Sequence, residues 1–145
     1  MKLKMTQEEK MLLIKDLSAR LPYAVTVEHT SGFRGTLHDI TVHHMYDEND
    51  NVYDAICYTD FFGDEDSIYI EYFKPYLFPL SSMTTEQRYE LHDLIHNLNV
   101  LAINGEIGDW IVSSSEIDWY NKNHFDYRGL IEKGLAIDAT GKNIY

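Results

Sequence analysis

The chain has 145 residues, of which 44% are apolar and 13% aromatic, and its formal net charge is −12. A chain of this length buries a core without help from a metal or a disulfide. Its only cysteine, Cys57, excludes an internal disulfide and a four-thiolate zinc site. We therefore expect one α+β domain over residues 1–145 that needs no cofactor.

The acidic groups are concentrated in the middle of the chain. Residues 23–80 hold eleven acidic and two basic groups, whereas residues 1–22 hold three acidic and five basic ones. An acidic surface repels phosphate backbones, which argues against direct nucleic-acid binding. The charged N-terminus lacks the apolar core of a signal peptide, and no stretch reaches the length of a membrane span. These features predict a cytoplasmic protein that does not associate with membranes.

The N-terminal segment predicts a helix. Thr6 and Glu9 match a capping box, in which each side chain binds a free backbone N–H group of the first turn. Pro22 disfavours helical geometry in the preceding residue, so we expect the helix to end near Arg20. Its core-facing positions are Leu13, Ile14, Leu17 and Leu21, which recur at helical spacing.

The following region predicts a sheet. Between residues 23 and 73, strand-length runs alternate with turn signals and no helical pattern separates them. This arrangement predicts an antiparallel meander of three or four strands. Residues 74–83 contain two prolines, so we expect them to cross the surface as an extended arm and not to form a central strand.

A long central helix is the clearest prediction in the second half. Thr84 and Gln87 form another capping box, and the Asn104–Gly105 pair ends the region. One apolar stripe follows helical spacing at Leu91, Leu94, Ile95 and Leu98. Because an apolar stripe needs a cover, we expect this helix and the others to pack on one face of the sheet.

The tail predicts two short helices. Ser113 and Glu116 match a third capping box, which opens a helix through Tyr120. Asp126 suits the N-cap of the next helix, and Gly134 suits the left-handed position just past its end, with Leu130 and Ile131 on its apolar face.

The stretch HFDYRGLIEKGLAID, residues 124–138, concentrates reactive side chains, yet capping explains several of them. Three of its side chains have no capping role: His124, Tyr127 and Arg128. Gly129 is costly inside a helix, and a close approach by another backbone would explain it. We interpret the stretch as mostly structural.

His92 and His96 are the best candidate metal ligands. Residues four apart share one face of a helix, so the two imidazoles can bind one zinc ion. The metalloprotease signature has Glu where this chain has Asp93, and no third ligand follows at a familiar spacing; His124 is the only later histidine. Catalytic zinc generally needs three protein ligands, so two half-exposed histidines beside the apolar stripe are the favoured interpretation.

Three further histidines and the cysteine lie in segments that predict strands. On a regular strand His38 and His44 share a face and His43 points the other way. The two histidines on one face are either metal ligands or part of a polar surface of the sheet. The polar surface is favoured. Cys57 lies within a strand-like run with no glycine-rich turn nearby, which predicts a buried, inert thiol.

An acidic loop with two aromatic residues is the candidate contact for a protein partner. Its residues are Asp60, Phe61, Phe62, Asp64, Glu65 and Asp66. Apolar rings surrounded by carboxylates suit a partner with a basic surface. An ordinary hairpin tip with one phenylalanine in the core is the simpler alternative.

Two segments carry a resemblance to known proteins: KPYLFPLSSMT (74–84) and DWYNKNHFDYRGLIEKGLAID (118–138). They resemble a family of small uncharacterised proteins from prophages and other mobile elements of gut bacteria. The family has no known activity, so the resemblance implies a bacterial accessory protein and transfers no catalytic residue. It covers about half of the chain and leaves residues 24–73 as the divergent part.

These observations leave three functional hypotheses. The favoured one is a non-enzymatic protein that binds a protein partner through its acidic sheet and loops, residues 47–66. The second is an acidic mimic of nucleic acid that inhibits a host nucleic-acid-binding or defence protein. The third is a metal-dependent hydrolase that uses His92 and His96, with Asp93 as base.

Overall fold

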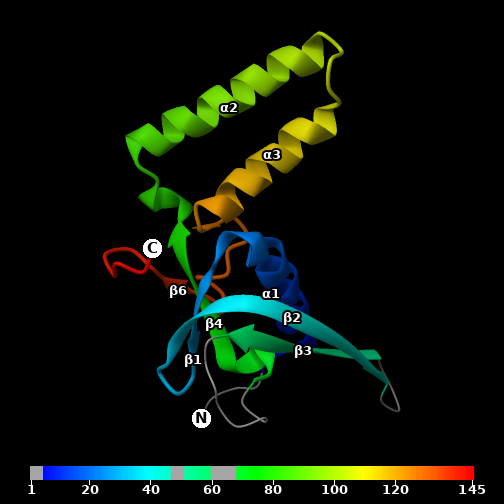
Figure 1. Cartoon of the computed structure of the whole chain (residues 1–145), viewed down its shortest axis with the longest axis vertical. Coiled ribbons are helices and arrows are strands. Elements are labelled where there is room, and N and C mark those ends of the chain that lie inside the picture. The colour runs from blue at the N-terminus through cyan, green and yellow to red at the C-terminus, as the bar shows by residue number, and fades with distance from the viewer. Residues whose placement is uncertain (1–4, 47–50, 60–67) are drawn as a thin grey trace.

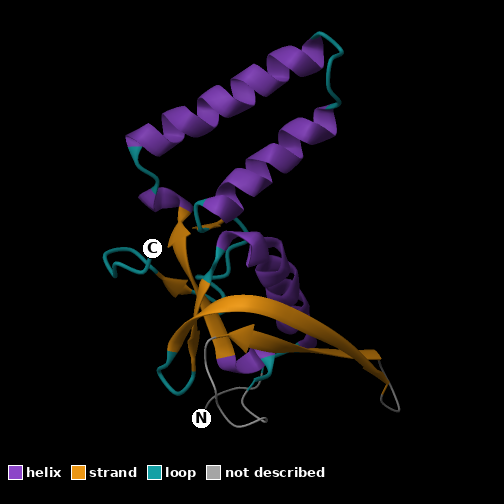
Figure 2. Cartoon of the chain, in the orientation of Figure 1, coloured by secondary structure: helices purple, strands orange, loops and turns teal. Residues whose placement is uncertain are grey.

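The computed structural model describes residues 5–46, 51–59 and 68–145 of the chain. A helix is followed by a run of strands, two long helices and two short strands (Figures 1 and 2). Helices and strands together confirm the α+β class. The elements are α1 (Gln7–Arg20), the 3₁₀ helix η1 (Leu21–Tyr23), β1 (Thr26–His29), β2 (Arg34–Tyr46), β3 (Asn51–Thr59), the 3₁₀ helix η3 (Ile70–Tyr72), β4 (Phe73–Pro79), the 3₁₀ helix η4 (Leu80–Ser82), α2 (Thr85–Ile103), α3 (Asp109–Lys122), β5 (Phe125–Asp126) and β6 (Ile137–Asp138).

The sheet is mixed, not purely antiparallel. Within the described residues it has six strands in the order β3-β2-β1-β4-β5, and β6 also pairs with β4. β1 runs antiparallel to β2 and β4, and β2 runs antiparallel to β3, whereas β5 and β6 run parallel to β4. The prediction of three or four antiparallel strands is confirmed for β1–β4, but it missed the parallel strands β5 and β6, which make the sheet six-stranded and mixed. β5 and β6 have two residues each, and such short strands leave no alternating pattern in a sequence.

β4 is an interior strand despite its two prolines, so the predicted surface arm is wrong. Thr30 N–H donates to the carbonyl of Tyr72 at 3.0 Å, and Val27 lies opposite Pro75 three residues further along. Because antiparallel pairs alternate between bonded and non-bonded, Val27 and Pro75 form a non-bonded pair. The missing N–H of Pro75 thus costs no bond to β1, and the second proline is the last residue of the strand.

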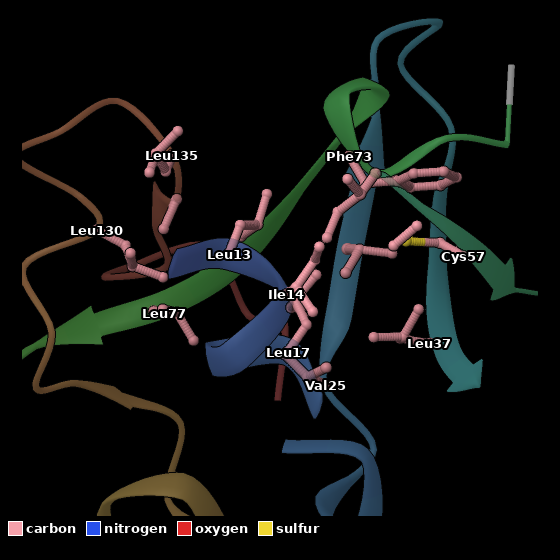
Figure 3. Close-up of a cluster of buried hydrophobic side chains, with 14 residues drawn as sticks. Leu13, Ile14, Leu17, Val25, Leu37, Cys57, Phe73, Leu77, Leu130 and Leu135 are labelled. Atoms are coloured by element: carbon pink, nitrogen blue, oxygen red, sulfur yellow. The ribbon is translucent and has the colours of Figure 1, made fainter. Parts of the chain in front are cut away.

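α1 begins and ends as predicted. Thr6 Oγ1 accepts the N–H of Glu9 at 3.1 Å, and Glu9 Oε1 accepts the N–H of Thr6 at 3.1 Å, so the capping box is confirmed. Arg20 is its last residue. The helix lies over the sheet and contributes Leu13, Ile14 and Leu17 to the main core (Figure 3). The other buried members of that core are Val25, Val27, Leu37, Ala55, Cys57, Ile70, Phe73, Leu77, Leu130, Leu135 and Ala136.

α2 and α3 form an antiparallel helical hairpin that extends away from the sheet (Figure 1). The capping box of Thr84 and Gln87 and the end at Asn104 are confirmed. The expectation that the long helix packs on the sheet face is wrong, because only the base of the hairpin joins a second, smaller core at one end of the sheet. Its buried members are Leu91, Trp119 and Phe125.

The tail departs from the predicted pair of short helices. α3 begins at Asp109 after Gly108, so Ser113 lies inside the helix and does not cap it. The predicted helix after Asp126 is reduced to a turn, because Gly129 and Gly134 both have positive φ angles, of 76° and 73°, and interrupt helical geometry on either side. The suggestion that another backbone passes close to Gly129 is wrong, because a Cβ atom at this position would have no other atom within 4 Å.

A buried ion cluster joins α1 to the segment after α3. The carboxylate of Asp16, fully buried, contacts Arg20 through Oδ2–Nε at 2.8 Å and Oδ1–Nη2 at 3.1 Å. Arg128 Nε lies 3.2 Å from Oδ1 of the same carboxylate. Arg20 Nη2 also donates to the carbonyl of Phe125 at 2.7 Å, and both guanidinium groups lie over the ring of Tyr127. One buried carboxylate therefore contacts two cations, the buried Arg20 and the partly buried Arg128.

We expect Asp16→Ala to reduce the free energy of unfolding by about 3–5 kcal/mol, because it leaves the fully buried guanidinium of Arg20 without a counter-ion and removes the partner of Arg128. Urea unfolding of the two proteins measures the difference. Asp93→Ala is the control, since the side chain of Asp93 is 78% exposed and its loss should change stability by less than about 0.5 kcal/mol. Equal effects of the two substitutions would show that the cluster does not stabilise the fold.

Candidate functional site

The histidine of the stretch 124–138 is part of the fold. His124 has a φ angle of 62°, and its ring stacks on Tyr145 with 3.5 Å between ring centroids. Burial, with the nearby charge of Arg20, lowers the pKa of His124 to about 4. Tyr145 is fixed in turn, because its hydroxyl donates to the carbonyl of Tyr76 at 2.7 Å and accepts the N–H of Thr26 at 3.0 Å. The imidazole is therefore neutral near pH 7 and is held in place.

The remaining side chains of that stretch also have structural roles. Asp126 accepts the N–H groups of Leu130 and Ile131, both at 2.9 Å, so its capping role is confirmed although only one turn follows. That turn ends as predicted at Gly134, where Leu135 N–H bonds the carbonyl of Leu130 and Gly134 N–H bonds that of Ile131. With Tyr127 and Arg128 in the ion cluster, the interpretation of the stretch as mostly structural holds.

We expect the protein to lose stability as pH falls from about 6.5, the ordinary pKa of histidine, toward about 4, the pKa of His124 in the fold. The sign follows because a lowered pKa means that the unfolded chain binds the proton more readily. His124→Asn removes the titrating group and tolerates the positive φ angle, so its free energy of unfolding should depend less steeply on pH over this range. Urea unfolding at a series of pH values measures both slopes.

His96→Asn provides the control for that series, because His96 is exposed and should leave the pH dependence of the wild type unchanged. If His124→Asn and the wild type lost stability in parallel, another group would be responsible for the acid sensitivity.

The predicted metal pair is close in space but incomplete. The rings of His92 and His96 are parallel, with 6.3 Å between their centroids, and the side chain of His92 is 78% exposed. The carboxylate of Asp93 lies 4.0 Å from His92 Nδ1. Within the part of the chain that the structure describes, no group of three His, Cys, Asp or Glu side chains can hold a metal ion. In those described residues the two imidazoles thus supply two of the three protein ligands that a catalytic zinc ion generally needs.

The strand of the three histidines is irregular at one of them. Pairing between β2 and β3 shifts register between Leu37 and Asp39, so the irregular position of the strand is at His38. The side chain of His44 lies outside the described part of the chain, so the shared face of His38 and His44 stays a prediction. His38 and His43 are exposed.

Cys57 is buried in the main core, as predicted. Burial, with a smaller effect of Asp54, raises the pKa of its thiol to about 12, which keeps it protonated and poorly reactive.

The predicted contact loop falls outside the described residues. This applies to Asp60, Phe61, Phe62, Asp64, Glu65 and Asp66, and to residues 47–50 of the acidic turn. The assignment of this loop to partner binding stays a prediction.

One open depression in the described surface has a volume of about 440 Å³. Glu28, His29, Glu71, Tyr72 and Lys74 line it. Its side chains are engaged elsewhere: His29 Nδ1 contacts Ser31 Oγ at 2.9 Å, and Glu28 accepts the hydroxyl of Tyr76 at 2.8 Å. No nucleophile paired with a base stands out in it.

The helical hairpin presents the most unusual surface of the described chain. Of the apolar residues on α2 only Leu91 is buried, and on α3 only Trp119, whereas α1 buries Leu13, Ile14 and Leu17. Ile103 is 84% exposed, Trp110 73% and Tyr89 67%. We call the exposed apolar side chains of α2 and α3 the hairpin surface: Tyr89, Val100, Leu101, Ile103, Trp110 and Ile117.

Sequence reasoning identified the stripe of α2 but missed this surface. The stripe at Leu91, Leu94, Ile95 and Leu98 accounts for the side of the helix that meets α3, and Leu94 and Ile95 pack on the second core. Tyr89, Val100 and Ile103 lie off that stripe, on the other side of the helix. Helical spacing places His92, Asp93 and His96 on that same side, so no periodic apolar pattern in the sequence marks it.

Comparisons with known proteins add no relative: no family model, curated protein or solved structure matches the chain. The resemblance to prophage proteins therefore stays a prediction. Among the described helices, none has both the length and the apolar character needed to cross a bilayer. The features on which a function can be based are thus the fold itself and the hairpin surface that it presents.

Proposed function

We propose that this protein acts by binding another protein, without catalysis, and that the α2–α3 hairpin is its binding element. The observation that carries the proposal is the exposure of Ile103, Trp110 and Tyr89 on a hairpin whose base alone is packed. Ile103 and Trp110 flank the turn between the two helices, whereas Tyr89 lies near the start of α2. Large apolar side chains that gather on the surface of a folded monomer commonly mark a contact for a partner. Tryptophan and tyrosine are also the residues that most often dominate the energy of protein interfaces.

The state of the reactive side chains supports binding over catalysis. Proton transfer near neutral pH is most efficient for groups whose pKa is close to 7. In this fold the pKa of His124 is lowered to about 4, while those of Cys57 and Tyr145 are raised to about 12. Asp16 is neutralised by two arginines.

Site-specific photo-crosslinking in the native host tests the proposal. A photoreactive phenylalanine analogue replaces Tyr89, Ile103 or Trp110, one at a time. We expect one discrete crosslinked protein to be shared by the three positions, because they belong to one hairpin. The partner is then purified and its affinity for the wild-type chain is measured directly.

Matched controls come from exposed apolar residues outside the hairpin. Met11 on α1 is 41% exposed and Val42 on β2 is 47% exposed, so the analogue also reaches solvent there. The same crosslinked protein at these positions, or no discrete product at the hairpin, would contradict the proposal. The double variant Ile103→Ser, Trp110→Ser should weaken binding of the purified partner about 100-fold or more, as loss of two interface anchors does.

Inhibition by nucleic-acid mimicry is the second candidate, favoured by the net charge of −12. A mimic competes with nucleic acid for its partner through carboxylates alone. Competition between duplex DNA and this protein for the crosslinked partner, unaffected by Trp110→Ser, would support mimicry over an apolar interface.

A further inference from the structure

The hairpin combines its apolar surface with an excess of negative charge, because its only basic residues, Arg88 and Lys122, lie at the base, near the start of α2 and at the end of α3. From Tyr89 to Asn121 the sequence has no lysine or arginine but six carboxylates: Glu90, Asp93, Glu106, Asp109, Glu116 and Asp118. All six are at least partly exposed.

The carboxylates alternate with the apolar residues of the hairpin surface. Glu90 follows Tyr89, Asp109 precedes Trp110, and Glu106 lies three residues beyond Ile103. The three most exposed side chains therefore each have a carboxylate within three residues along the chain, although Tyr89 also follows Arg88. The hairpin thus presents apolar anchors bordered by carboxylates along its length.

This charge pattern argues against a second copy of the chain as the partner. Two hairpins packed on one another through Ile103 and Trp110 place carboxylates of both copies around the same apolar contact, and the hairpin's only basic residues, Arg88 and Lys122, lie at its other end. Like charges brought together at an interface cost free energy and suppress that pairing. A surface of opposite charge is attracted instead.

The turn between the helices prepares Trp110 for contact. A Cβ atom at Gly108 would lie 2.8 Å from both Cδ1 and Nε1 of the Trp110 indole. Only glycine therefore lets this ring lie against the start of α3 while 73% of the residue remains exposed. A side chain that is placed before binding loses less conformational entropy on binding.

We propose that the hairpin docks on a basic protein surface, in which an apolar groove accepts Trp110 and Ile103 and lysine or arginine side chains at its rim meet the flanking carboxylates. This inference rests on the proposed function and specifies the chemistry of the partner. Apolar burial supplies most of the affinity, and the paired charges supply specificity and a faster association rate.

A defined probe tests the charge and the apolar contact together. The probe is a fluorescently labelled amphipathic helical peptide with leucine on one face and lysine on the other, titrated against the full chain by fluorescence anisotropy. The matched peptide has glutamate in place of lysine. We expect the lysine peptide to bind, the glutamate peptide not to bind, and the affinity to fall as salt is raised from about 0.05 to 0.5 M.

Two variants of equal net charge separate a site from general attraction. The hairpin variant carries Glu90→Gln, Asp93→Asn, Glu106→Gln and Asp109→Asn. The control variant carries Glu8→Gln, Asp39→Asn, Glu132→Gln and Asp138→Asn, all exposed positions outside the hairpin. Loss of four exposed charge pairs should weaken lysine-peptide binding about tenfold in the hairpin variant, and the control variant should bind like the wild type.

Several results would overturn the inference. Equal weakening in both variants shows general electrostatic attraction and no site on the hairpin. Undiminished binding in Gly108→Ala and in Trp110→Ser shows that the apolar contact plays no part. A dimer in sedimentation equilibrium that Trp110→Asp dissociates identifies a second copy as the occupant.

The test also distinguishes this inference from the proposed function. If a partner crosslinks to the hairpin in the host but its affinity is independent of salt and of the four hairpin carboxylates, binding by the hairpin stands and only the basic partner is wrong. If no partner crosslinks to the hairpin, both are wrong.

Discussion

The buried carboxylate of Asp16 is the constraint on which the rest of the fold depends. It fixes Arg20, and Arg20 reaches the carbonyl of Phe125, 105 residues further along the chain. Arginine suits this position because its planar group binds one carboxylate twice and still has donors for a carbonyl. The contact places the segment that begins with β5 beside the end of α1. From there the chain turns back to add β6 to β4, so that β4 is enclosed on both sides.

The hairpin differs from the body of the protein, which is α1 and the sheet, in how its apolar residues are covered. The body buries its apolar residues between α1 and the sheet (Figure 3). The hairpin is connected to the body only through its base, where Leu91, Trp119 and Phe125 pack together, and the stacked rings of Trp119 and Phe125 are 5.6 Å apart. Beyond that base each helix has only the other helix to cover it, so the side of α2 that faces away from α3 stays in water. The exposure of Tyr89, Val100 and Ile103 on that side follows directly from this geometry.

Reactive groups in this protein are used to hold the fold together. His124 and Tyr145 stack on each other, and burial moves the pKa of the first down and of the second up, away from neutrality. Each shift disfavours the charged form of its group, as desolvation requires. A sequence stretch that resembles a catalytic cluster can therefore be a set of buried anchors.

The sequence by itself determined the features that depend on near neighbours along the chain. The capping boxes at Thr6 and Thr84, the cap at Asp126 and the left-handed Gly134 are settled by residues within a few positions of each other, so local pattern predicts them. Only the tertiary structure decided the rest. The interior position of β4, the roles of His124 and Arg128, and the uncovered face of α2 depend on contacts between residues far apart in the sequence. No local sequence pattern predicts such contacts, because the free energy gained by burial depends on which residues the folded chain brings together.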